Sequence, residues 1–320
     1  MTMAAIDFEA EPVFSHVSVM PGEVVEALDP ARGGVFVDAT AGGAGHSAAL
    51  LAASPNLRLI ACDRDPLAVR TAQARLSRFG ERALCVHASF DLIPERLAAL
   101  GITQVDGILA DLGLSSQQLA DADRGMSFRS SGPLDMRMDP TRGETALELI
   151  ERLSQDELAN VIYELGEERR SRRVARCIKQ AFEAGELKDT LELRRAVVRA
   201  VGPRRLGGVD PATRTFQALR MFINDELGQI GQGLVAAANA LAVGGRLAAI
   251  SFHSLEDRAV KQFMQAQSTV APELARLPVI PPSAEPRFRL VGRKTRPAED
   301  EVKRNPRARS ATLRVAERVR

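Results

Sequence analysis

Short apolar runs alternate with helical patterns along the first third of the chain. Runs rich in β-branched and large apolar residues predict strands over Val35–Val37, Leu57–Cys62, Leu84–Ala88 and Val105–Ala110. After the second of these strands, Pro66–Arg78 has a helical pattern with proline in its first turn. Strands that alternate with helices form a parallel sheet with right-handed crossovers and helices on both faces. We therefore expect an α/β, doubly wound, Rossmann-like fold.

The alternation stops after Asp111. A loop rich in Ser, Gly and Asp is expected to run to about Arg142 without a helix of its own, and polar loops of this length are usually functional. A purely helical block follows. Within it, Ser154–Glu157 is a capping box that opens a helix, and further helices are expected over Glu167–Glu183 and Asp189–Val201. The block is predicted to be an all-helical insertion into the sheet domain.

A helical pattern resumes at Thr213, where apolar residues recur at three- and four-residue spacing. We expect Gly244–Gly245 to end this helix and a fifth strand to follow over Arg246–Phe252. Phe288–Val291 and Ser310–Val315 are predicted to be the last strands. These elements return the chain to the sheet after the insertion.

The order of the elements divides the chain into three segments. Residues 1–139 and 213–320 are expected to form one sheet domain, and residues 140–212 a helical domain inserted into it. The 320 residues are about twice the ~150 residues of a usual domain, which agrees with two structural units. With 45% hydrophobic and 26% charged residues, the composition is that of an ordinary globular protein.

Cysteine usage and hydropathy exclude several classes of protein. Cys62, Cys85 and Cys177 form no CxxC pair and no Cys/His cluster, which argues against structural zinc and a disulfide framework. No apolar run approaches the ~20 residues of a membrane span, and the acidic start of the chain lacks the pattern of a signal peptide. We expect a cytoplasmic protein without a metal and without a membrane contact.

A glycine cluster follows the first predicted strand, where a doubly wound sheet binds its ligand. Gly43–Ala48 fits the pattern G-x-G-x-x-A, and Asp63 lies eighteen residues after Gly45, at the end of the second strand. An acidic side chain at that place can bind ribose hydroxyls. The spacing predicts a nucleoside-cofactor site, and a glycine turn without a ligand is the alternative.

Charge favours one nucleoside cofactor over another. Asp38, at the end of the first strand, would repel the pyrophosphate of a dinucleotide. The ammonium and sulfonium of S-adenosylmethionine would instead be attracted by Asp38 and by Asp111, at the end of the fourth strand. Phe90 is placed to lie against an adenine ring, although a core position suits it equally well. An NAD(P)-dependent oxidoreductase is the weaker alternative.

The net charge is only +2, but the basic residues are unevenly placed. Arginines gather over Arg169–Arg176 and at Arg204–Arg205, and a further basic cluster lies over Lys303–Arg309. Such clusters either bind nucleic-acid phosphates or form solvated helix faces, and composition alone leaves both readings open.

Six stretches form long, distinctive motifs along the chain: His16–Met20, Asp63–Pro66, Asp111–Gln118, Gly132–Pro140, Ser251–Arg258 and Asn305–Ser310. Together they closely resemble the bacterial ribosomal RNA small subunit methyltransferase H family, in the same order from His16 to the C-terminus. Members of that family transfer a methyl group from S-adenosylmethionine to N4 of a cytidine in the decoding region of 16S ribosomal RNA.

The resemblance implies a class I S-adenosylmethionine-dependent methyltransferase fold whose helical insertion recognises the substrate. It also implies 16S ribosomal RNA as the partner, either as naked RNA or within the small ribosomal subunit. A monomer and a homodimer are both left open by the sequence. The cofactor contacts of the family fall on Ala44, Gly45, His46, Asp63, Phe90, Asp111 and Gln118. Ala44 departs from the family, which usually has glycine there, and its methyl group weakens binding only if the ligand packs against that Cα.

Methylation of an exocyclic cytosine amine needs acceptors that orient a weakly nucleophilic nitrogen. We expect Asp111 and the Ser115–Ser116 region to supply them, with His253, just beyond the fifth strand, as a second candidate. His253 has a structural alternative, because Ser254 can cap a plain helix there. A ribosome-associated RNA-binding protein without activity is a third functional reading, and the nearly complete set of cofactor contacts weakens it.

Overall fold

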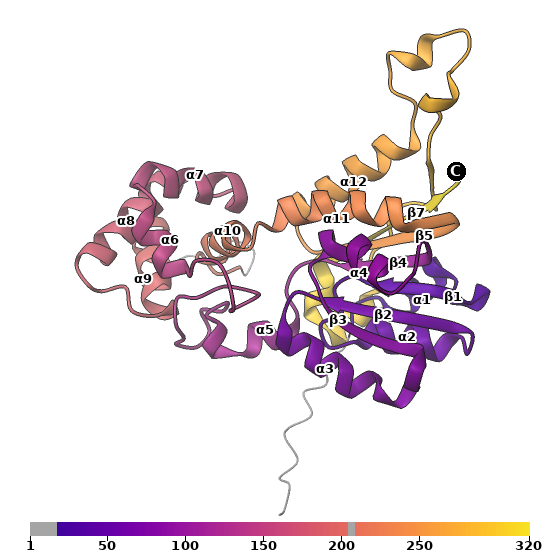
Figure 1. The fold of residues 1–320 in the computed structure, drawn as a ribbon. Coiled ribbons are helices and arrows are strands. Elements are labelled where there is room, and N and C mark those ends of the chain that lie inside the picture. Colours follow the sequence, from indigo (N-terminus) through magenta and orange to yellow (C-terminus); the bar gives the residue numbers. More distant parts are fainter. Residues whose placement is uncertain (1–17, 204–208) are drawn as a thin grey trace, which may run out of the picture.

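The computed structural model describes residues 18–203 and 209–320 (Figure 1). The seven strands in this part of the chain form one sheet in the order β3-β2-β1-β4-β5-β7-β6. Strands β1 to β5 pair in parallel, and β7 is antiparallel to both β5 and β6. The strands are β1 (Gly34–Asp38), β2 (Leu57–Asp63), β3 (Ala83–His87), β4 (Val105–Asp111), β5 (Leu241–Ser251), β6 (Phe288–Leu290) and β7 (Thr312–Arg318). The predicted doubly wound sheet is confirmed.

Helices cover both faces of the sheet, because each face of the nearly continuous apolar strands needs a partner. One face packs against α1 (Pro21–Leu28), α2 (Gly45–Ala53) and α3 (Pro66–Leu76). The other face packs against α4 (Ile93–Ala99), α11 (Glu226–Ala240) and α12 (Ser254–Ser268). The short helix α13 (Glu299–Arg304) precedes β7.

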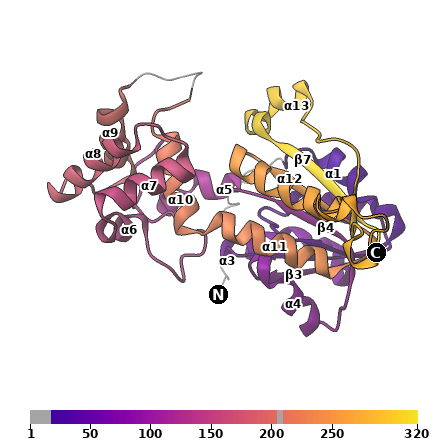
Figure 2. The same ribbon diagram turned by 90° about the horizontal axis from the view of Figure 1, so that it is seen from above.

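A second hydrophobic core lies beside the sheet domain (Figure 2). Leu134 and Met136, from the loop after β4, are buried in this core together with Phe216. Its helices are α6 (Ala146–Arg152), α7 (Gln155–Gly166), α8 (Ser171–Glu183), α9 (Thr190–Val201) and α10 (Thr213–Ile223). The helical insertion therefore has an apolar interior of its own, while the division at residues 139 and 212 stays a prediction.

The single helix expected from Thr213 is wrong, because the chain breaks between α10 and α11. Asn224 ends α10, and its side chain accepts a hydrogen bond from Met138 N at 2.7 Å and donates one to the Met136 carbonyl at 2.8 Å. Asp225 follows in the left-handed conformation with φ 45°. These long-range bonds hold the loop after β4 against the helices, and local periodicity carries no sign of them.

Several expected element ends are corrected. Gly244–Gly245 lies inside β5, which begins directly after α11. Helix α8 begins at Ser171 and not at the expected Glu167. Glu167 is left-handed with φ 51°, and its N–H donates to the Ile162 carbonyl at the C-terminal end of α7. The predicted helices α7 and α9 are confirmed, whereas α6 was not predicted although Thr145–Glu148 is a capping box of the same kind.

Candidate cofactor and substrate site

A cleft opens at the carboxyl ends of β1, β2, β4 and β5, where a doubly wound sheet binds its ligand. Its empty volume, with the open mouth included, is about 1140 Å³. Seven of the predicted site residues line it: Gly45, His46, Asp63, Phe90, Asp111, Ser115 and Gln118. The sequence therefore located the cleft, and Ala44 and His253 lie beside it without being among the lining residues.

Polar contacts fix the turn after β1. Gly42 N donates to Asp63 Oδ2 at 2.7 Å, and Arg75 Nη1 donates to the Gly43 carbonyl at 2.8 Å. The turn is thus tied to the end of β2 and to α3 before any ligand arrives. A loop held in this way loses little conformational entropy on binding.

Gly45 and Ala44, in this turn, differ in what surrounds their Cβ positions. A Cβ at Gly45 would lie 1.9 Å from Ser18 Oγ, so only glycine allows Ser18 to approach and line the cleft. Ala44 is left-handed with φ 54° and is fully buried in the core on the α2 side of the sheet. Its methyl group belongs to that core, and the departure from the family's glycine leaves the cleft lining unchanged.

Asp63 ends β2 and is 9% exposed. Besides the bond from Gly42, its Oδ1 accepts a hydrogen bond from Asp65 N at 2.9 Å. Burial raises the pKa of Asp63 to about 6, although the hydrogen bonds from Asp65 and Gly42 act in the opposite direction. At neutral pH the carboxylate is ionised and has lone pairs left for further donors, as a ribose-binding acid requires.

Asp38 does not face the ligand, contrary to the expectation from sequence. In the sheet it pairs with Ala61 and Leu109, each two residues short of the strand-end carboxylates of Asp63 and Asp111. Asp38 therefore lies one pleat deeper and is 1% exposed, where Ser47 Oγ donates to its Oδ2 at 2.6 Å. Burial raises the pKa of Asp38 despite this hydrogen bond.

His46 and Asp111 form a pair across the cleft floor. His46 Nε2 lies 3.5 Å from Asp111 Oδ2, and the His46 ring is nearly inaccessible to solvent. Burial lowers the pKa of His46, but the nearby carboxylate of Asp111, together with that of Asp38, outweighs burial and raises it overall. Asp111 Oδ1 is buried and accepts no hydrogen bond from the described residues. This unused acceptor fits a cationic ligand group.

Phe90 lies both in the core and at the cleft, and its contact with an adenine ring stays a prediction. It is 6% exposed, belongs to the core on the α11 side, and also lines the cleft. A Cβ at Gly233 would lie 2.2 Å from Phe90 Cδ1, so glycine in α11 allows the ring to pack flush against that helix. The ring is held rigidly and presents one apolar surface to the cleft.

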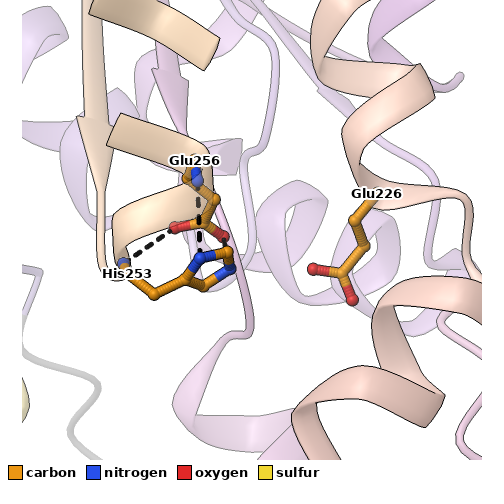
Figure 3. Close-up of side chains that lie close together, drawn as sticks. All are labelled: Glu226, His253 and Glu256. Carbon is orange, nitrogen blue, oxygen red and sulfur yellow. Dashed lines mark hydrogen bonds and ion pairs between the residues drawn. The ribbon is translucent and has the colours of Figure 1, made fainter. Parts of the chain in front are cut away.

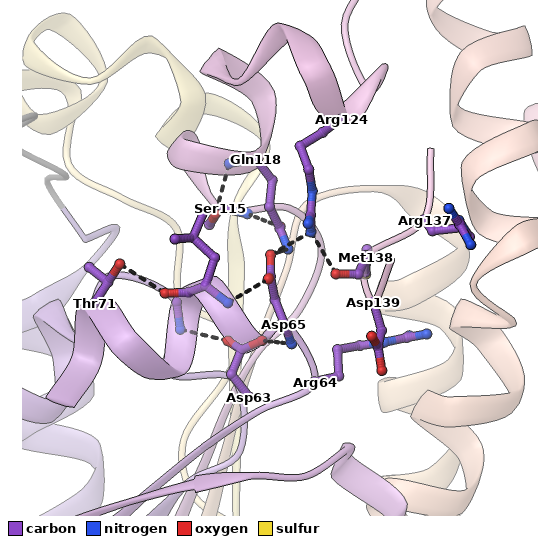
Figure 4. A network of polar contacts seen from close by, with 12 residues as sticks. Asp63, Arg64, Asp65, Thr71, Ser115, Gln118, Arg124, Arg137, Met138 and Asp139 are labelled. Atoms are coloured by element: carbon purple, nitrogen blue, oxygen red, sulfur yellow. Dashed lines mark hydrogen bonds and ion pairs between the residues drawn. The ribbon is translucent and has the colours of Figure 1, made fainter. Parts of the chain in front are cut away.

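The loop after β4 is ordered by a polar network (Figure 4). Gln118 Nε2 donates to Asp65 Oδ2 at 2.9 Å, and Arg124 Nη2 donates to the same oxygen at 2.5 Å and to the Met138 carbonyl at 2.6 Å. Ser115 Oγ accepts from Gln118 N at 3.1 Å in a capping box. This box opens α5 (Ser116–Ala120), so the expectation of a loop without a helix is wrong.

His253 caps α12 and lies next to two carboxylates (Figure 3). One ligand atom each from Glu226, His253 and Glu256 lie within 4.8 Å of one another. Both Glu226 oxygens accept from the Arg220 guanidinium, at 2.7 and 3.0 Å. His253 Nε2 lies 3.0 Å from Glu256 Oε1, and His253, not Ser254, is the N-cap. The contacts of Glu226 join α10 to α11, and those of His253 and Glu256 cap α12, so each has a structural role.

The C-terminal segment also reaches the cleft. Asn305 and Arg307 are lining residues, and Arg307 Nη2 donates to the Leu114 carbonyl at 3.1 Å. Burial lowers the pKa of Arg307, while the charge of Asp111 acts in the opposite direction. The half-buried Arg307 therefore lines the cofactor cleft, and RNA binding by the cluster over Lys303–Arg309 stays a prediction.

A second hollow lies on the helical insertion and is mostly basic. We call it the arginine pocket; its lining residues are Asn160, Tyr163, Arg169, Arg170, Ser171, Arg172 and Arg173. Tyr163, the only tyrosine in the chain, is 59% exposed. The arginines are exposed as predicted, whereas Tyr163 was not singled out from the sequence. His16, Arg204–Arg205 and the side chain of Ser116 lie outside the described residues.

Comparison with known proteins decides the family. The model of the MraW methylase family matches residues 13–319. The chain belongs to this family. It is 58% identical over 304 residues to the ribosomal RNA small subunit methyltransferase H of Sorangium cellulosum, covering 95% of this chain and 91% of the relative. It is 48% identical over 320 residues to that of Halorhodospira halophila, covering 99% and 98%.

Among solved structures, an rRNA methylase from Streptococcus thermophilus aligns with a TM-score of 0.42 at 12% identity, over 94% of each chain. Membership of the MraW methylase family confirms the class I methyltransferase fold with its helical insertion, and S-adenosylmethionine as the cofactor. No helix within residues 18–203 and 209–320 is both long and apolar enough to cross a membrane.

Some cleft residues were missed by reasoning from the sequence. Arg64, Glu226 and Gln229 line the cleft, although they were not predicted. Arg64 adjoins the predicted Asp63 and could have been found from that neighbour. Glu226 and Gln229 come from the first turns of α11 and reach the cleft only because the chain breaks at Asn224.

Proposed function

We propose that the protein methylates the N4 amine of a cytidine in 16S ribosomal RNA, using S-adenosylmethionine. The observation that carries this proposal is the family match over residues 13–319, joined to a strand-end cleft lined by the predicted cofactor residues. The NAD(P)-dependent oxidoreductase considered from sequence is set aside, because no such activity belongs to the relatives that the chain resembles at 58% and 48% identity.

The cleft suits the methyl donor. Asp63 is placed for ribose hydroxyls, Phe90 offers an apolar surface for a base, and the unused Oδ1 of Asp111 suits an ammonium or sulfonium. Gln118 and His46 complete the predicted set around them. When bound, S-adenosylmethionine supplies an electrophilic methyl group.

The chain must orient an amine whose lone pair is delocalised into the cytosine ring. Asp111 is the acceptor best placed for this task, since it ends β4 and is partly exposed to the cleft. Ser115 is a weaker candidate, because its Oγ already caps α5. His253 is also weaker, since Glu256 engages its ring. A methylated amine is cationic and loses its proton readily, so a dedicated base is unnecessary.

The arginine pocket supports RNA as the substrate. The side chains of Arg169 and Arg173 form no hydrogen bond or ion pair within the described part of the chain, so their charges are available to phosphates. Tyr163 offers an exposed ring on which an unpaired base can stack. We infer that residues 140–212 act as the substrate-recognition domain and that this pocket is their RNA contact.

Further features of the proposal follow from the relatives' name, which specifies the small-subunit RNA. We propose that the substrate RNA lies within the small ribosomal subunit, that the protein works in the cytoplasm without a metal or a membrane contact, and that it acts as a monomer or homodimer. These features rest on the family and on the sequence composition.

The proposal is tested by transfer of labelled methyl groups to small ribosomal subunits from a strain that lacks the modification. The purified protein is expected to label the 16S RNA of these subunits and not of subunits that already carry the modification. Binding of S-adenosylhomocysteine without any labelling would instead support the third reading, an RNA-binding protein that retains the cofactor fold.

A further inference from the structure

Several buried polar atoms of the cleft residues lack a hydrogen-bond partner within the described part of the chain, and two of them belong to residues without a role in the proposed function. These two atoms are Arg64 Nε, a donor, and Gln229 Oε1, an acceptor. Both residues line the cleft. A buried polar group without a partner costs about 1–3 kcal/mol, so such groups in a ligand cleft indicate that a ligand supplies the missing bonds.

Arg64 is held beside the first turns of α11, where Gln229 lies. Its Nη1 donates to the Asn224 carbonyl at 3.1 Å, at the break between α10 and α11. Glu226, in the first turn of α11, is the charged group that acts most strongly on the Arg64 guanidinium. The Arg64 head group is therefore held at the helix break, while its Nε keeps no partner within the described part of the chain.

The same end of the cleft holds the predicted ribose and base contacts. Arg64 directly follows Asp63, and the Asp63 carbonyl accepts from Ala88 N at 3.0 Å, two residues before Phe90. Phe90 packs against Gly233, one helical turn beyond Gln229 on the same face of α11. Asp63, Arg64, Phe90 and Gln229 thus surround one end of the cleft.

We infer that Arg64 and Gln229 read the edge of the adenine ring of the methyl donor. The amino group N6 of adenine is a donor and its neighbouring ring nitrogen is an acceptor. Gln229 Oε1 would accept from N6, and Arg64 Nε would donate to the ring nitrogen. This inference rests on the proposed function, because it assumes that a nucleoside cofactor occupies the cleft with its ribose at Asp63.

The test compares S-adenosylhomocysteine with S-inosylhomocysteine, in which an oxo group replaces the amino group at position 6. Both are titrated calorimetrically into the wild-type protein and into Gln229→Leu. We expect the wild-type protein to bind the adenosine compound at least about tenfold more tightly, because the oxo group would face the Gln229 acceptor. In Gln229→Leu, affinity for the adenosine compound should fall about tenfold and the preference should become clearly smaller, because only the contact of Arg64 still distinguishes the two compounds.

The Tm of the ligand-free protein distinguishes a ligand contact of Gln229 from a purely structural role of this residue. Replacing an unsatisfied buried acceptor by an apolar side chain is neutral or stabilising, so the Tm of Gln229→Leu is expected to equal or exceed that of the wild type. A residue that merely supported the fold would instead lower the Tm. Gln232→Leu, an exposed glutamine in the same helix, is the matched control and should change neither affinity nor preference.

The outcomes separate this inference from the function on which it rests. If the wild-type protein binds neither compound, the proposed function fails. If it binds S-adenosylhomocysteine and Gln229→Leu keeps the full preference, the assignment of Gln229 to adenine is wrong. The assignment is also wrong if Gln229→Leu binds the cofactor normally but no longer distinguishes subunits with cytidine from subunits with uridine at the target, since the residue would then read the RNA base.

Discussion

The cofactor cleft and the arginine pocket differ in how firmly their side chains are held. In the cleft, Asp63 is 9% exposed and two backbone N–H groups already hold its carboxylate. In the arginine pocket, Tyr163 is 59% exposed, and the side chain of Arg172 is 73% exposed beside Asp156. The polar groups of the first site are held by hydrogen bonds, whereas the second site consists of exposed cations and one exposed aromatic ring.

We relate this difference to the ligand proposed for each site. A small cofactor must be held in one orientation, which requires preorganised dipoles in a dry site. A ribosomal RNA surface is held through many phosphates, which requires charge more than geometry. Substitutions in the cleft should therefore alter cofactor binding and the chemical step, whereas substitutions in the arginine pocket should alter RNA binding and its dependence on salt.

The largest effect is expected at the end of β4. Asp111→Ala should reduce the rate of methyl transfer on the order of a hundredfold or more, because it removes a preorganised charge next to the reacting groups. Ser115→Ala should reduce the rate far less, since it chiefly loses a cap of about 1 kcal/mol at α5. Single-turnover rates with saturating subunits measure both. Equal, small effects would leave Asp111 without a catalytic role.

The next largest effect is expected at the ribose position. Asp63→Ala should raise the dissociation constant of S-adenosylhomocysteine about tenfold or more, since a hydrogen bond to a charged group contributes ~1.5–3 kcal/mol. Isothermal calorimetry measures this constant, and binding of small subunits should stay unchanged. Unaltered cofactor affinity would remove Asp63 from the site.

A smaller effect is expected on RNA binding from the arginine pocket. Reversing Arg172 and Arg173 to Glu should weaken subunit binding several-fold. The slope of the logarithm of the binding constant against the logarithm of the salt concentration should become shallower by roughly 0.7–0.9 for each lost phosphate contact. Cofactor affinity should not change. Reversal of the exposed Arg70 and Arg78 on the sheet domain makes the same change in net charge and is the control. An original salt slope in the pocket variant would make this cluster a solvated helix face.

The smallest effect is a pH dependence of cofactor binding. The pKa of Asp63 is raised to about 6, so its carboxylate becomes protonated as the pH falls through that value and loses acceptor strength. The dissociation constant of S-adenosylhomocysteine should rise roughly fourfold between pH 7.5 and 5.5. Asp63→Asn should abolish this contribution, and an identical pH profile in that variant would assign the titration to another group.

The raised pKa of Asp63 also affects the stability of the ligand-free protein. Here a low pH is favourable, whereas for cofactor binding it is unfavourable. Because the folded-state pKa of Asp63 lies above the unfolded value, its contribution to stability is present below about pH 4 and is lost as the pH rises through about 6. Denaturant unfolding of the wild type and Asp63→Asn across this range should show that difference.

The sequence predicted those features that short-range patterns determine. Apolar runs located β1 to β4, and the spacing of Gly45 and Asp63 placed both at the cleft. Capping boxes marked α7, and the same signal at Thr145 would have marked α6. In each case a local hydrogen bond or a side-chain period determines the element.

Other features depend on contacts between distant segments. Asp38 lies below Asp63 and Asp111 only because of the register between three strands. The break at Asn224 depends on bonds to Met136 and Met138, far away in the sequence. The lining role of Gln229 depends in turn on that break. No pattern within one segment contains this information.

The central claim is that the cofactor cleft acts on the exocyclic amine of a cytidine. The most direct test is to methylate unmodified small subunits with the purified protein, digest the 16S RNA and identify the labelled nucleoside by mass spectrometry. The account predicts a single site, with the methyl group on N4 of cytidine. A methyl group on a ring carbon, on a ribose or on another base would contradict it.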